Sequence, residues 1–153
     1  MLDIPVIIGN KKIVFSPGEH NVIQKAIIEE FFPRFGQGAE IFYVGDTADK
    51  YLYLEEQKLK DLHCFEISHD KLPDVIAFSK GKNWLFIIEA VDSANPIDPM
   101  RKRTLEALTE KCTAEVIFVT AFLNRASFKK FSSEIAWETE VWIVEKSRSH
   151  DSL

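Results

Sequence analysis

The chain has 153 residues, 46% of them hydrophobic, and a formal net charge of −5, values typical of one soluble globular domain rather than a disordered or fibrous protein. No apolar run approaches the roughly 18 residues that span a bilayer, so we expect a cytoplasmic protein with no membrane partner. The acidic total lowers the expectation of nucleic-acid binding, although a local basic face is compatible with it.

The first half of the chain predicts a hairpin, a helix, a strand and a short helix. The residues from Ile4 to Phe15 alternate around Gly9-Asn10, a dipeptide suited to the positive φ of a hairpin turn. Apolar residues at helical spacing predict a helix from about Asn21 to Phe32. Ala39 to Gly45 then reads as a strand, and an amphipathic helix is expected around Leu54 to Leu62.

The second half predicts strands that alternate with helices. Apolar runs mark the strands, and the spacing of apolar residues marks the helices. The expected elements are strands near Val75 to Phe78 and Trp84 to Val91, a helix from Met100 to Cys112, a strand from Ala114 to Phe122, a helix from Arg125 to Trp137 and a strand from Glu140 to Lys146.

This order predicts an α/β fold with a mixed sheet flanked by helices. Its αβββαβ portion is also the shared core of the PD-(D/E)XK restriction-endonuclease-like fold. We expect one domain over residues 1–146, made of the N-terminal hairpin 4–15 and the core 20–146, followed by a tail at 147–153.

Two carboxylates stand at the predicted central hairpin. Asp74 begins the first strand and Glu89 lies near the end of the second, fifteen positions later, so we expect the two to meet only if the strands are offset or twisted. A Mg²⁺ ion held by one or two carboxylates would neutralise a phosphate and activate water. The alternative is that Asp74 caps a turn and Glu89 is a solvated or ion-paired residue, because such spacings are common.

Longer stretches resemble a known family. Pro73-Asp74 and Glu89-Ala90 resemble the PD-(D/E)XK signature, with Val91 at the position of the lysine. The segments SPGEHNVIQKAIIEEF, YVGDTADK, LPDVI, NWLFIIEAV and VTAFLNRASFKKFSSEIAWETEVWIVE together resemble the catalytic domain of BsuBI/PstI-type restriction endonucleases, from about Ile4 to Glu145.

The resemblance implies a Mg²⁺-dependent type II restriction enzyme that cuts both strands of a palindromic DNA site, CTGCAG in the named members. By this resemblance Asp74, Glu89 and the carbonyl of Ala90 would bind the metal. Cutting two strands of a palindrome implies a homodimer. Glu29 or Glu30 on the first helix would be a further acidic group, and Asp46 and Thr47 are additional candidates.

Three positions depart from the family pattern, namely Val91, Ala94 and Met100. A lysine at such a site activates water and stabilises the charge of the phosphate. We expect Lys102 to replace it, with Lys50 as the alternative. The rival hypothesis is an eroded relative that serves as a DNA- or protein-binding module. A further possibility is a chain that works with a separate recognition domain or protein, since the N-terminal domain of the family is not matched.

Other features have simpler interpretations. The basic run Arg101 to Arg103, with Arg125, Lys129 and Lys130, could contact DNA phosphates or form a solvated helix face. Trp137 and Trp142 are predicted to pack in the core, and His20 to begin a helix rather than act as a base. Cys64 and Cys112 form no ligand cluster, so we expect two reduced thiols and no zinc site.

Overall fold

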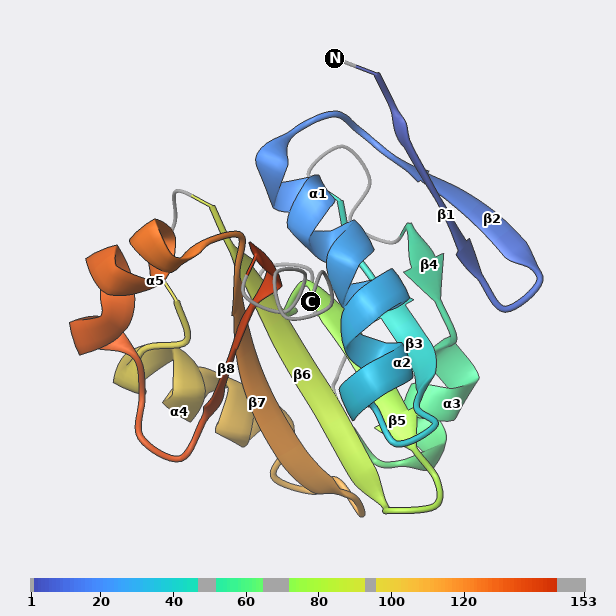
Figure 1. Ribbon diagram of the computed structural model, residues 1–153. Coiled ribbons are helices and arrows are strands. Elements are labelled where there is room, and N and C mark those ends of the chain that lie inside the picture. The colour runs from blue at the N-terminus through green and yellow to red at the C-terminus, as the bar shows by residue number, and fades with distance from the viewer. Residues whose placement is uncertain (1, 47–51, 65–71, 93–95, 146–153) are drawn as a thin grey trace.

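The computed structural model describes residues 2–46, 52–64, 72–92 and 96–145 (Figure 1). Within these residues a six-stranded mixed sheet has the order β4-β3-β5-β6-β7-β8, and a separate two-stranded hairpin has the order β1-β2. The strands are β1 Ile4–Ile8, β2 Lys11–Phe15, β3 Glu40–Val44, β4 Tyr53–Leu54, β5 Val75–Ser79, β6 Trp84–Val91, β7 Glu115–Phe122 and β8 Glu140–Ile143. The predicted mixed α/β fold is therefore confirmed.

Helices lie on both sides of the sheet (Figure 1). The first helical segment begins at Glu19 and consists of a regular helix, one π-helical turn and a last short turn. It packs on one face with the N-terminal hairpin, while α3 and α4 supply residues to the core cluster of the other face. The helical elements are α1 Glu19–Ala26, η1 Ile27–Phe31, α2 Phe32–Phe35, α3 Glu56–Asp61, α4 Pro99–Leu108, α5 Arg125–Phe131 and η2 Ser132–Glu134.

The position of β6 and β7 inside the sheet explains why their sequences are so apolar. β6 and β7 pair in parallel along eight residues each, and a parallel pair needs a crossover connection, which contains α4. Because both faces of these strands are covered, WLFIIEAV and EVIFVTAF are almost entirely apolar. Glu115 is charged at the exposed start of β7, whereas Glu89 is charged inside the ladder, opposite Thr120 near the end of β6, and this makes its position informative.

Several predicted boundaries were wrong. The helix expected to reach Cys112 ends at Leu108, and the helix expected to reach Trp137 ends at Phe131 and continues only as η2. Trp142 is buried as predicted, but Trp137 is 90% exposed. Trp137 lies beyond the last helical turn, so no helix face turns it toward the sheet.

The expectation of two free thiols is also wrong. Cys64 and Cys112 form a disulfide, with their Cα atoms 4.7 Å apart. A backbone hydrogen bond of 3.0 Å from the Thr113 N–H to the carbonyl of Leu62 joins the same two segments. The separation of 48 positions between the cysteines concealed this proximity in the sequence. Within the described ranges, no helix is both long enough and apolar enough to cross a bilayer.

Candidate active site

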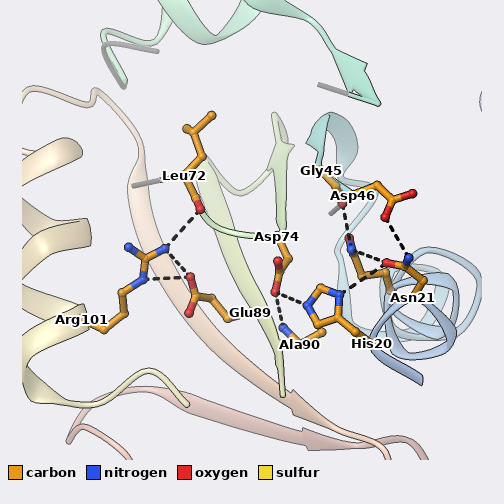
Figure 2. A network of polar contacts seen from close by, with 10 residues as sticks. His20, Asn21, Gly45, Asp46, Leu72, Asp74, Glu89, Ala90 and Arg101 are labelled. Carbon is orange, nitrogen blue, oxygen red and sulfur yellow. Dashed lines mark hydrogen bonds and ion pairs between the residues drawn. The ribbon is translucent and has the colours of Figure 1, made fainter. Parts of the chain in front are cut away.

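Asp74 and Glu89 lie opposite each other where β5 begins. Val75 pairs with Ile88 in the antiparallel ladder, and the same register continued by one step places Asp74 opposite Glu89. The expectation that only an offset or a twist could bring them together was wrong, because the four-residue turn between β5 and β6 sets this direct register. Both residues line a cavity of about 520 Å³. Figure 2 shows their side chains with the partners that hold them.

The Asp74 carboxylate is held through one of its two oxygens. Oδ2 accepts a hydrogen bond of 2.8 Å from the Ala90 N–H and lies 3.2 Å from Nε2 of His20. The backbone carbonyl of Asp74 accepts a hydrogen bond of 3.1 Å from the Gly45 N–H, which anchors the residue at the edge of β3. Oδ1 accepts no hydrogen bond from any described residue, so it remains available for a ligand.

The Glu89 carboxylate is held in a similar way from α4. Its Oε1 accepts hydrogen bonds from Nε and Nη2 of Arg101, at 2.9 and 2.5 Å. Oε2 has no hydrogen bond within the described part of the chain. The Glu89 side chain is only 14% exposed, and this burial raises its pKa above the usual value, while the Arg101 guanidinium opposes the shift.

Packing between β6 and α4 explains why Arg101 reaches Glu89. Ile87 and Leu105 belong to one buried cluster. Glu89 lies two residues beyond Ile87 on the same strand face, and Arg101 lies four residues before Leu105 on the same helix face. The ion pair therefore extends an apolar contact toward the cavity. Nη2 of Arg101 also donates to the carbonyl of Leu72, at 3.2 Å.

His20 is a member of the site that sequence reasoning missed. It lies in the first turn of α1, and its contact with Asp74 joins residues 54 positions apart. The hydrogen bond to Asp74 raises the pKa of His20 above its usual value, although burial opposes the shift. The signal in the sequence was its place at a helix start, since helix starts often line the edge of a sheet.

A buried polar network beside His20 holds α1 in place (Figure 2). Asn21 donates to Oδ1 of Asp46 at 3.0 Å, and Gln24 donates to the carbonyl of Gly45 at 2.8 Å. Asp46 also accepts from the N–H and the hydroxyl of Ser16, both at 2.8 Å. In this structure Asp46 thus joins the hairpin to α1, which is a structural use of a residue predicted as a metal candidate.

Two further carboxyl groups interact beside the site. Glu19 precedes His20, and a hydrogen bond to Asp92 raises the pKa of Glu19. Neither residue was singled out in the sequence. The acidic candidates on the first helix are Glu29 and Glu30. They follow His20 by nine and ten residues, which at 1.5 Å per residue is about 14 Å along the helix axis. Oε1 of Glu29 lies 3.9 Å from Nζ of Lys25.

The remaining predicted residues lie in different surroundings. Lys102 lies 3.9 Å from Glu106 on its own helix and is not among the residues that line the cavity. Val91 is buried against Phe122 and Phe131. Met100 is 70% exposed and lines the cavity. Thr47, Lys50 and Ala94 lie outside the described residues.

The donor atoms fit a hard cation. Two carboxylates and the carbonyl of Ala90 are oxygen donors, and Mg²⁺ takes oxygen ligands and keeps several of its waters, so it needs few protein groups. Among the described residues, no group of three or more His, Cys, Asp and Glu side chains could hold a metal. The fit therefore rests on the opposed pair Asp74 and Glu89, each with one oxygen left available.

Comparisons with known proteins place these residues in a family context. The model of the BsuBI/PstI restriction endonuclease domain matches residues 4–150. The chain is 43% identical over 143 residues to the type II restriction enzyme BsuBI of Bacillus subtilis, covering 93% of this chain and 45% of that protein. It is 29% identical over 144 residues to the type II restriction enzyme AplI of Arthrospira platensis, covering 89% of this chain and 44% of that one.

A solved structure agrees with the sequence matches. The SdaI restriction endonuclease superposes with a TM-score of 0.88 at 35% identity, covering 95% of this chain and 46% of its own. The chain therefore spans less than half the length of each of these relatives.

Proposed function

Because the chain belongs to the BsuBI/PstI restriction endonuclease family, we propose that it hydrolyses phosphodiester bonds of double-stranded DNA in the cavity beside Asp74 and Glu89, with Mg²⁺ as cofactor. One observation carries the proposal. The two carboxylates lie opposite each other at the start of β5, and each is held through a single oxygen. This arrangement favours binding of a cation between them.

Asp74, Glu89 and the carbonyl of Ala90 would hold the metal. When bound, Mg²⁺ would supply charge neutralisation on the phosphate and an activated water. The chain's own residues position the carboxylates, since Ala90 N–H and His20 orient Asp74, and Arg101 orients Glu89. Lys102 remains a candidate for the missing lysine, and would have to leave Glu106 to reach the phosphate.

For the substrate and partners we infer a palindromic site resembling CTGCAG and a homodimer, because two strands of a symmetric site call for two active sites. Since the chain spans less than half the length of its relatives, base recognition could come from a separate domain or protein. In that arrangement the described chain supplies the cutting site, and its basic helices supply phosphate contacts.

A second function is favoured by two residues. Val91 is buried at the motif position and Met100 lies at the cavity, and neither side chain can stabilise a phosphate. An eroded relative that binds DNA or protein without cutting would tolerate both. This candidate predicts DNA binding that is independent of Mg²⁺ and falls with salt concentration.

The test is cleavage of supercoiled plasmid DNA carrying CTGCAG across a titration of Mg²⁺ and of Mn²⁺. Asp74→Ala and Glu89→Ala are run beside the unchanged chain, with Asp61→Ala, an exposed substitution on α3, as the control. Metal-dependent cutting that both site variants abolish and the control retains would support the nuclease. No cutting, together with no metal binding by calorimetry, would favour the binding module.

A further inference from the structure

The PD-(D/E)XK signature names carboxylates and a lysine, and it gives no role to Arg101. Its Nε and Nη2 donate to Glu89, and Nη2 also donates to the carbonyl of Leu72. Nη1 donates to no described residue, so its two N–H groups remain available. The Arg101 side chain is 24% exposed and lines the same cavity as Asp74 and Glu89.

Few other cations of the described residues can serve this cavity. Among the described residues that line it, His20 and Arg101 are the basic ones, and His20 is turned to Asp74. Lys102 is rotated by about 100° from Arg101 around the axis of α4, and lies near Glu106. The helix thus directs its third residue, rather than its fourth, at the two carboxylates.

The chemistry of a guanidinium suits a double task. Its planar fork can bind a carboxylate on one edge and a phosphate oxygen on another, and it stays charged at any working pH. The position that the signature reserves for lysine is occupied by Val91, which is buried with Phe122 and Phe131. Positive charge for the phosphate must therefore come from a different element.

We propose that Arg101 binds the scissile phosphate through Nη1, while Nε and Nη2 hold Glu89 in place for the metal. This inference rests on the proposed nuclease function and names the cation that completes its site. Arg101 would stabilise the negative charge that grows on the phosphate in the transition state. α4 would then take over a role that the signature assigns to the strand containing Val91.

The deciding experiment compares single-turnover cleavage with Mn²⁺ binding measured by calorimetry in the absence of DNA. Arg101→Gln should slow cleavage by about 100-fold or more, as expected for losing one preorganised charge donor. Its affinity for Mn²⁺ should fall much less than its cleavage rate, because the register of β5 and β6 still places Glu89 opposite Asp74 when the guanidinium that holds Glu89 is gone. A loss of metal binding as large as the loss of cleavage would overturn the proposal, since Arg101 would then only position Glu89.

Three variants sharpen the result. Arg34→Gln makes the same chemical change in α2, about 21 Å along the first helical segment from His20, and should cut at the unchanged rate. Arg101→Lys retains the charge without the fork, so it should cut faster than Arg101→Gln and more slowly than the unchanged chain. Lys102→Gln should lose less activity than Arg101→Gln, and a greater loss would overturn the proposal in favour of Lys102.

The outcomes separate the two proposals. An unchanged chain that cuts no DNA contradicts the nuclease function itself. An unchanged chain that cuts, beside an Arg101→Gln variant that cuts equally well, contradicts only the role of Arg101. If Arg101→Gln fails to fold in a thermal melt, Arg101→Lys decides, and cleavage by that variant at the unchanged rate overturns the proposal.

Discussion

The two flanks of the candidate site are built differently. On the α1 side, the helix that carries His20 is fixed by a hydrogen-bond network, whose members Asn21, Gln24 and Asp46 are almost fully buried. On the α4 side, Arg101 is partly exposed and is held by an ion pair and one carbonyl. The α1 flank therefore depends on hydrogen-bond geometry and the α4 flank on charge. Substitutions on the α1 flank should therefore mainly lower stability, and substitutions on the α4 flank should mainly lower activity.

The largest expected effect lies between the flanks, at Glu89. Glu89→Gln preserves the shape of the side chain but removes its charge, so metal binding and cleavage should fall by about 1,000-fold or more, equivalent to about 4 kcal/mol. Single-turnover cleavage with Mg²⁺ measures the loss. Glu106→Gln, on the exposed side of α4, is the matched control. Cleavage by Glu89→Gln at the unchanged rate would remove Glu89 from the metal site.

The next largest effect should be a loss of stability on the α1 flank. Asp46→Ala removes the acceptor of the Ser16 N–H and of the Ser16 hydroxyl. It also removes one acceptor of the Asn21 amide, which still donates to the carbonyl of Ser16, and buried donors without partners are costly. We expect about 3 kcal/mol less stability to urea. Asp61→Ala, which removes an exposed bond to Gln57, should change stability by less than about 0.5 kcal/mol. Equal losses in the two variants would refute the structural role of Asp46.

The N-caps of α4 and α5 offer a matched pair of substitutions, because α4 carries Arg101 and α5 does not. Asp98 accepts from the Arg101 N–H at 2.7 Å and caps α4, and Asn124 accepts from the Ser127 N–H at 2.9 Å and caps α5. Asp98→Ala and Asn124→Ala should each lower stability by about 1 kcal/mol. Asp98→Ala alone should also slow cleavage, because it loosens the turn that carries Arg101. Equal cleavage rates for both variants would show that the start of α4 tolerates movement.

The smallest effect concerns pH and His20. Because its pKa is raised in the folded protein, His20 contributes stability that is fully present below its unfolded pKa and is lost as pH rises through the folded pKa. The free energy of unfolding of the unchanged chain should exceed that of His20→Gln by more at pH 6 than at pH 8.5. The difference should be less than about 1 kcal/mol for this partly exposed pair. Urea unfolding in EDTA measures the difference. A gap that grows with rising pH would contradict the assigned contact.

Local patterns were sufficient to predict most of the fold. Alternation around Gly9-Asn10 predicted the first hairpin, and apolar runs predicted β5, β6 and β7, because side-chain periodicity depends only on near neighbours in the chain. The order of these elements predicted the αβββαβ core. Helix ends were less predictable, as at Trp137, because the last turns depend on contacts with other elements.

The candidate site divides in the same way. The sequence by itself singled out Asp74 and Glu89 as candidates, through their resemblance to the PD-(D/E)XK signature and their place on two strands joined by a tight turn. It did not determine which basic residue meets them, because Arg101 and Lys102 are adjacent and only the packing of Leu105 sets the rotation of α4. Nor did it reveal the contact of His20 with Asp74 across 54 residues. Contacts between distant segments arise only when the whole core assembles, and so the tertiary structure alone decided them.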